Sequence, residues 1–225
     1  LAAGVAHEIN NPLQGILNFA TLLQNRPENF ERNKEITQRI IDECQRVAKI
    51  TQDLLFYSKD CRRETKLVSI WDVINGALSL VETKLNNNHV LIVRDISESL
   101  PKLLLQPQSI QQVILNLVDN AYDALRYKGE VEETPTIGIS VRTIDLDDGP
   151  CLCIEVSDNG IGMSESVVKM AREAFFTTKP ASEGTGLGLS IVRDIVSKHD
   201  GRLGISSVEG KGTRVSIEIP IKSEA

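Results

Sequence analysis

The stretch Asn116-Leu117-Val118-Asp119-Asn120-Ala121 lies in a segment, Ser109 to Tyr127, whose apolar residues recur at helical spacing. A serine at the start of this segment is suited to cap a helix. Asn116 and Asn120 are four residues apart, so they share one face of the expected helix. Carboxamide oxygens on one face can ligate a hard cation that bridges phosphate groups, and magnesium is the expected ion. The alternative interpretation is a pair of ordinary capping or surface amides.

The segments on both sides of this helix predict a mixed α/β domain. The expected helices are Trp71 to Leu85 and about Leu187 to His199, and the expected strands are His89 to Arg94, Thr136 to Ile144 and Pro150 to Ser157. Two further strands, Arg202 to Ser207 and Thr213 to Ile219, flank Glu209-Gly210-Lys211-Gly212 and are expected to close the domain as a hairpin.

Two glycine-rich blocks follow in the same half of the chain. Asp158-Asn159-Gly160-Ile161-Gly162-Met163 comes directly after an apolar strand, and Gly184-Thr185-Gly186-Leu187-Gly188-Leu189 precedes a helix. Glycine lets the backbone approach a ligand closely, and the free N–H groups at a helix start attract phosphate. Neither block matches the P-loop or the dinucleotide fingerprint. The blocks therefore indicate a different kind of phosphate site, with plain turns as the alternative.

The first 60 residues have a different pattern. Apolar residues recur every three or four positions from Leu13 to Leu23 and again from Ile36 to Leu54, which predicts two helices joined near Arg26-Pro27-Glu28. Each helix has a long apolar stripe that a single partner helix does not cover. Two hairpins paired as a four-helix bundle would bury it, so we expect a homodimer.

The block His7-Glu8-Ile9-Asn10-Asn11-Pro12 begins the first helix. A proline inside a helix removes the hydrogen bond to the carbonyl of Glu8 and costs about 3 kcal/mol, so a bend is expected here. Asn11 follows His7 by four residues, which places its amide on the same helix face, one turn along. A lone histidine is usually structural, but these neighbours favour a reactive imidazole.

The four blocks, in this order, resemble the H, N, G1 and G2 boxes of histidine kinases that have a HisKA-type phosphoacceptor domain. The resemblance covers essentially the whole chain. It implies a helical hairpin at residues 1–60 that forms a dimeric four-helix bundle, a hinge at 61–66, and a GHKL (Bergerat) α/β sandwich that binds ATP at 67–225.

The resemblance also implies roles for particular residues. His7 would accept the phosphoryl group, Glu8 would orient and deprotonate it, and Asn11 would position water for dephosphorylating a regulator. Asn120 would supply the Mg²⁺ ligand, and Asp158 would accept a hydrogen bond from the adenine amino group. The remaining ATP-binding positions would be Asn116, Gly160, Gly162, Lys179, Gly184, Thr185, Gly186, Leu187, Gly188 and Thr213.

One block departs from the family pattern. Where many members read Phe-Glu-Pro-Phe, this chain reads Arg172-Glu173-Ala174-Phe175, so the packing of the nucleotide lid is expected to differ. The related gyrase-type hydrolases have a glutamate that acts as a general base at the position of Asn116. The amide of Asn116 is not basic enough to take that role. Slow direct hydrolysis is therefore expected.

Together the motifs predict a protein histidine kinase, a phosphotransferase that uses ATP and Mg²⁺ to phosphorylate itself on His7 and then a response-regulator aspartate. Two alternatives stay open: an enzyme that acts mainly as a regulator phosphatase, and a nucleotide-gated scaffold without catalysis. The partners expected are a second copy of the chain and the receiver domain of a response regulator.

Composition narrows the setting. The formal net charge of −6, with scattered basic residues, argues against a nucleic-acid partner. No apolar stretch approaches the roughly 20 residues that cross a bilayer, so no membrane contact is expected from this fragment. Cys44, Cys61, Cys151 and Cys153 lack zinc spacing and are expected to be reduced thiols. We expect a cytoplasmic location, either as a cytoplasmic protein or as the cytoplasmic part of a membrane-anchored sensor. A sensor region is expected ahead of Leu1.

Overall fold

The computed structural model describes residues 2–25, 30–58, 64–97, 99–129, 132–180 and 184–221. The chain forms two compact units, Leu1–Cys61 together with Glu173–Leu187, and Arg62–Arg172 together with Gly188–Ala225. The segment 173–187, which the sequence assigns to the ATP-binding part, thus groups with the helical hairpin. Among the described residues, none of the helices combines the length and the apolar character needed to span a bilayer.

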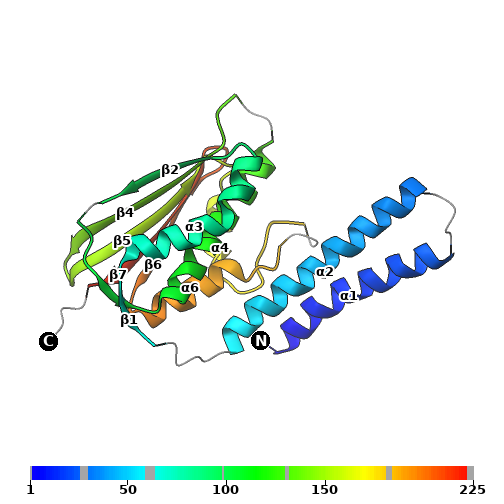
Figure 1. The fold of residues 1–225 in the computed structure, drawn as a ribbon, viewed down its shortest axis with the longest axis horizontal. Helices are drawn as coiled ribbons and strands as arrows, with labels where there is room; N and C mark the ends of the chain where they lie inside the picture. The colour runs from blue at the N-terminus through cyan, green and yellow to red at the C-terminus, as the bar shows by residue number, and fades with distance from the viewer. Residues whose placement is uncertain are drawn as a thin grey trace. The chain divides into compact units, whose positions relative to one another are not determined.

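The first unit is built on two helices that run side by side, α1 (Ala2–Asn25) and α2 (Phe30–Ser58) (Figure 1). Ile36 and Ile50 of α2 are almost fully buried, as the spacing of apolar residues in the sequence predicts. Pro12 lies inside α1, and the helix continues through it. The missing N–H at Pro12 leaves the carbonyl of Glu8 without its usual helical partner.

The second unit contains a five-stranded mixed sheet in the order β2-β4-β5-β7-β6. Its strands are β2 (Leu91–Ile96), β4 (Thr136–Leu146), β5 (Gly149–Asp158), β6 (Arg202–Val208) and β7 (Gly212–Pro220). The β2–β4 pair is parallel and the other three pairs are antiparallel. The expected strands and the closing hairpin are all present.

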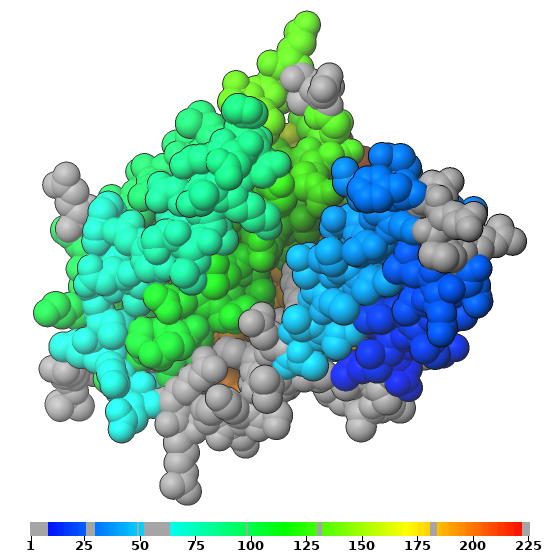
Figure 2. Space-filling view, turned by 45° about the vertical axis from the view of Figure 1, so that its right-hand side comes forward, coloured from blue at the N-terminus to red at the C-terminus, as the bar shows by residue number. Residues whose placement is uncertain are grey.

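Three helices of this unit cover one face of the sheet: α3 (Ile70–Asn87), α4 (Pro107–Lys128) and α6 (Gly188–Lys198) (Figure 1). The middle helix, α4, contacts both other helices and strands β4, β5 and β7. In the space-filling view, α3 and α4 form one continuous stretch of surface (Figure 2). Three side chains spaced along α4 are buried in the core of the unit: Ile110, Ile114 and Val118. Packing therefore holds the helix in place along its length.

Three short elements were not expected from the sequence. Strands β1 (Lys66–Val68) and β3 (Leu103–Leu105) form an antiparallel pair, and α5 (Glu165–Met170) is a single short helix. Segments of three to six residues are too short to show a period, which explains why the pattern did not reveal them. Helix α4 begins at Pro107 rather than Ser109, because proline at the first helical position already has a helical φ angle.

Truncating Ile114 tests the role of α4 as the central helix of this unit. Ile114 is 0% exposed, so Ile114→Ala should lower the free energy of unfolding by about 2 to 5 kcal/mol through lost burial and a residual cavity. Urea unfolding can be followed by fluorescence of Trp71, the only tryptophan. Leu80→Ala is the control, since Leu80 is exposed and its loss should change stability by less than about 0.5 kcal/mol. Equal effects of the two changes would contradict this description of the core.

Candidate functional site

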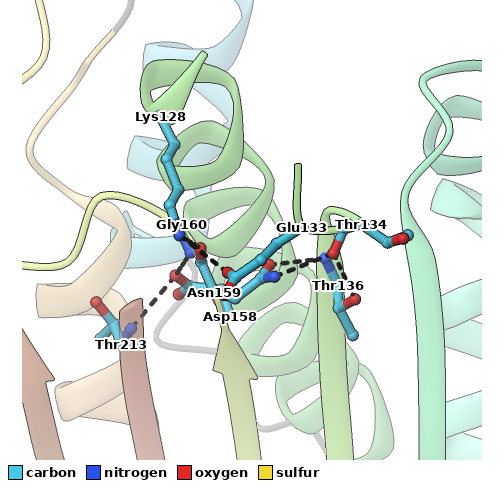
Figure 3. Close-up of polar contacts among 8 residues, drawn as sticks. All are labelled: Lys128, Glu133, Thr134, Thr136, Asp158, Asn159, Gly160 and Thr213. Atoms are coloured by element: carbon cyan, nitrogen blue, oxygen red, sulfur yellow. Dashed lines mark hydrogen bonds and ion pairs between the residues drawn. The ribbon is translucent and has the colours of Figure 1, made fainter. Parts of the chain in front are cut away.

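The carboxylate of Asp158 lies at the carboxyl end of the central strand β5, next to the turn that follows it (Figure 3). Its Oδ1 accepts hydrogen bonds from the backbone N–H of Gly160 at 2.8 Å and from that of Thr213 at 3.3 Å. Two fixed backbone donors hold one carboxylate oxygen in place. The side chain is therefore positioned before any ligand arrives.

Burial raises the pKa of the Asp158 carboxyl above its ordinary value of 3.8. The hydrogen bonds from Gly160 and Thr213, and the positive charge of Lys128, act in the opposite direction and lower the pKa. Because burial is the largest of these effects, the ionised form becomes the minor one at a higher pH than for an exposed aspartate. A ligand that needs the carboxylate will accordingly bind less well as the solution becomes acidic.

Two glycines shape the turn after Asp158. A Cβ atom at Gly160 would lie 2.6 Å from the backbone carbon of Ala124 in α4, so only glycine allows this close approach. Gly162 has a φ of +65°, and a Cβ there would collide with the backbone carbonyl of Val208. The glycines therefore bring the turn against α4 on one side and the β6–β7 hairpin on the other.

Helix α4 carries both asparagines that the sequence singled out. Asn116 is 8% exposed; its Oδ1 accepts a hydrogen bond from Gln112, and its Nδ2 donates to the carbonyl of Gly188 at 3.4 Å. The carboxamide of Asn120 also lies next to Gly188, since a Cβ at that glycine would be 3.6 Å from Asn120 Nδ2. Both amides are thus at the N-terminus of α6, where free N–H groups favour anions.

Thr213 is connected to this turn through Ser207, which the sequence did not indicate. Ser207 Oγ lies 2.9 Å from Thr213 Oγ1, donates to the carbonyl of Gly212 and accepts from the N–H of Met163 at 2.8 Å. The hydroxyl therefore joins the glycine turn to the start of β7. A serine in a strand has no distinguishing pattern, so no signal in the sequence could have found it.

The segment 173–187 holds five further positions named from the sequence. Gly184, Thr185 and Leu187 are buried, and Lys179 and Gly186 are partly exposed. The N–H of Phe175 donates to the carbonyl of Gly186 at 2.9 Å, and Phe175 itself has a φ of +68°. This hydrogen bond joins the two ends of the segment. Phe175 is also the last residue of the block Arg172–Phe175, where the sequence departs from the family pattern.

The phosphoacceptor block lies in α1, where the backbone of His7 and Glu8 is helical. The side chains of these two residues lie outside the described part of the structure. Asn11 is exposed on the same helix. The expected hinge covers residues 61–66. Lys66 lies in β1, and residues 61–63, which include Cys61, are outside the described residues. The described cysteines, Cys44, Cys151 and Cys153, are unpaired thiols.

Two family models match this chain. Residues 105–223, more than half of the chain, match the model described as histidine kinase-, DNA gyrase B-, and HSP90-like ATPase. Residues 1–60 match the His Kinase A (phospho-acceptor) domain. The chain therefore belongs to this ATPase family. The chain thus combines a phosphoacceptor domain of the histidine kinase type with a histidine kinase-like ATP-binding domain, as the motifs predicted.

Individual relatives agree with this assignment. The sensor histidine kinase ZraS of Escherichia coli O157:H7 is 32% identical over 98% of this chain and 46% of its own length. The sensory histidine kinase/phosphatase NtrB of Rhodobacter capsulatus is 32% identical over 98% of this chain and 61% of its own. The chain thus spans about half the length of ZraS.

A solved structure extends the likeness to the fold. The histidine kinase ThkA, crystallised in complex with the response regulator protein TrrA, superposes with a TM-score of 0.74 at 26% identity. The match covers 98% of this chain and 61% of that one. The expected architecture, a helical hairpin followed by a GHKL-type α/β domain, is confirmed.

Replacing Gly162 should disturb the site more than replacing Gly210. Both glycines have positive φ, +65° and +79°, but a Cβ at Gly162 meets backbone whereas a Cβ at Gly210 meets open space. Gly162→Ala is therefore expected to weaken ADP binding, measured by calorimetry, and Gly210→Ala to cause only the smaller loss of stability due to backbone strain. Equal losses of ADP affinity would show that space at residue 162 is unimportant.

Proposed function

We propose that this chain uses ATP to phosphorylate its own His7 and passes the phosphoryl group to an aspartate of a response regulator. The observation that carries the proposal is the arrangement of Asp158 and Asn120. The backbone N–H of Gly160 holds the Asp158 carboxylate in place, and Gly160 packs on α4, the helix that carries Asn120. This arrangement occurs in a chain whose first 60 residues match a phosphoacceptor domain.

Asp158 would recognise adenine by accepting a hydrogen bond from its amino group. Oδ1 is already bonded to two backbone N–H groups, so Oδ2 is the oxygen that is better placed to accept. Gly160 and Gly162 would let the ring lie close to the backbone. Lys179 and the glycines of 184–188 would contact the phosphates, together with the N-terminus of α6.

Mg²⁺ fits the donors that this site offers. Asn120 has a hard carboxamide oxygen, and within the described ranges no group of three His, Cys, Asp or Glu side chains could hold a metal by itself. Mg²⁺ commonly has few protein ligands and completes its shell with phosphate oxygens and water. When bound, it would neutralise charge on the phosphates. Asn120 would be its protein ligand.

Transfer requires a neutral imidazole, because its free ring nitrogen must attack the γ-phosphorus. A bond forms between that nitrogen and phosphorus while the bond from phosphorus to the β,γ-bridging oxygen breaks, and ADP leaves. Glu8 would take the proton from the other ring nitrogen. Asn116 argues against hydrolysis as the main reaction, since its amide is not basic and both of its polar atoms are bonded within the fold.

Dephosphorylation of the regulator is a second candidate activity of the same hairpin. Asn11 is exposed one turn after His7, where its amide could orient a water molecule toward a phosphorylated aspartate. NtrB, one of the relatives, is named as both kinase and phosphatase. The regulator would dock along α1, where Gln14, Asn18, Thr21 and Leu22 are all exposed.

The domain boundaries are also part of this proposal: the hairpin at 1–60, the hinge at 61–66 and the ATP-binding domain at 67–225. We further propose a cytoplasmic location.

Labelling with γ-labelled ATP and magnesium tests the kinase. Wild-type protein should acquire label that is lost in acid, as expected for phosphohistidine, while His7→Ala and Asn120→Ala should acquire none. Asn11→Ala is the control, because the proposal assigns it no part in autophosphorylation, and it should label normally. Label that survives in His7→Ala would rule out this acceptor. A wild type that binds ATP without labelling would favour the phosphatase or the nucleotide-gated scaffold.

A homodimer is proposed because the described part of the hairpin leaves apolar side chains uncovered. Leu13 and Leu17 are exposed one turn apart on α1, and Ile41 is exposed on α2. Cys44 and Ala48, three and seven residues after Ile41, continue that face and are also exposed. A second hairpin would bury these residues in a four-helix bundle.

A charge at Leu17 should therefore dissociate the dimer. Leu17 is 63% exposed in the single chain, so Leu17→Asp should leave the hairpin folded while placing a charge in the dimer interface. Sedimentation equilibrium should show a shift from dimer toward monomer. Asn18→Asp introduces the same charge one residue along without removing apolar surface, and it should remain dimeric. An unchanged mass for Leu17→Asp would contradict the proposed interface.

A further inference from the structure

Lys128 is buried to an unusual degree for a lysine at the end of a helix. It lies in the last turn of α4, yet its side chain is only 16% exposed. Its Nζ donates to the backbone carbonyl of Asn159 at 2.6 Å (Figure 3). A lysine that only complements the helix dipole would extend into solvent. A largely covered ammonium group is costly unless acceptors and charges compensate it, and here the Asn159 carbonyl and the Glu133 carboxylate do so.

The residue that Lys128 contacts is the second residue of the Asp158–Gly160 turn. The same turn is bonded to α4 a second time, because the N–H of Ile161 donates to the carbonyl of Ala124 at 3.1 Å. Gly160 packs directly on Ala124. Lys128 and Ala124 are one helical turn apart, so α4 holds the three residues that follow Asp158 at two points.

The side chain of Asn159 fixes the turn from the opposite side. Its Oδ1 accepts from the N–H of Thr136 at 2.8 Å, and its Nδ2 donates to the carbonyl of Thr134 at 3.0 Å. These bonds join the turn to the start of β4 (Figure 3). The turn is thus held by strand and helix contacts, and the positive charge of Lys128 acts on the Asp158 carboxylate.

Groups from α4, β7, β4 and the loop before β4 lie around the turn that carries Asp158. Helix α4 contributes Lys128, whose field acts on the carboxylate, whereas β7 contributes the neutral Thr213. β4 contributes the neutral Thr136, and the loop before it contributes Glu133, whose carboxylate is 3.5 Å from Lys128 Nζ and 71% exposed. Lys128 thus opposes the effect of burial on the pKa of Asp158.

We infer that Lys128 is a positioning residue for adenine recognition: it fixes the turn that carries Asp158 and holds a positive charge beside the base-reading carboxylate. The inference rests on the proposed role of Asp158 in binding adenine. Lys128 itself does not touch the reacting atoms. It acts through the geometry and the ionisation of Asp158.

Binding of ADP, measured by calorimetry across a series of pH values, tests this inference. Lys128→Met is expected to weaken ADP binding about tenfold at neutral pH, the size typical of a lost charge-assisted hydrogen bond. It should also move the acid-side loss of affinity to higher pH, because removal of the cation raises the pKa of Asp158 further. Lys128→Arg keeps the charge and should restore most of the wild-type profile.

Two further variants guard against misfolding and general charge effects. Glu133→Gln removes the exposed carboxylate that contacts Lys128, so it should leave the fold intact and the pH profile of ADP binding close to that of the wild type. Lys198→Met removes the exposed last-turn lysine of α6 and should match the wild type.

Each outcome decides the question. A shift of the acid-side loss in Lys128→Met that is absent in Glu133→Gln and reversed in Lys128→Arg would support the inference. A Lys128→Met profile like that of Lys198→Met, or a loss of affinity equal at every pH, would overturn it while leaving the proposed function standing. A wild type that failed to bind ADP at any pH would overturn the proposed function, and this inference with it.

Discussion

The close approach of Gly160 to the backbone of Ala124 is the constraint on which the proposed nucleotide site depends. It brings the end of the central strand β5 into contact with the central helix α4, so that a carboxylate from the sheet and carboxamides from the helix belong to one rigid arrangement. The hydrogen bond from Ile161 to Ala124 and the bond from Lys128 to Asn159 keep that contact closed. A side chain at residue 160 would separate strand from helix and move the Asp158 carboxylate away from the carboxamides of α4.

The same contact explains the electrostatic compromise at Asp158. Packing the turn on α4 removes water from the carboxylate and disfavours its charged form, which is the largest effect on its pKa. Backbone donors from Gly160 and Thr213 and the charge of Lys128 counter that effect. In the proposed role, the carboxylate of Asp158 would bind adenine more strongly in a site that excludes water only if it stays ionised, and these three groups favour the ionised form.

The sequence predicted the parts of the fold and site that leave a local pattern. Asn116 and Asn120 are recognisable because helical periodicity puts them on one face, and the paired glycine blocks are recognisable because few other roles require them. Lys128, Asn159 and Ser207 could not be found in this way, since each acts through a partner that only the folded chain brings near. The bond from Lys128 joins residues 31 positions apart. The strands β1 and β3 escaped notice for a simpler reason, because three residues show no period.

The parallel pairing of β2 with β4 has a consequence for how the chain folds. Leu91 of β2 lies beside Thr136 of β4, and helix α4 forms part of the long connection between these two strands. Non-local pairing of this kind must overcome the entropy of closing a large loop before its contacts repay the cost, so it tends to form late. The asparagines of α4 are therefore part of a long connection between paired strands. Because α4 lies between β2 and β4 in the chain and Asp158 ends β5, the proposed ATP site is assembled only when these strands have paired around the helix.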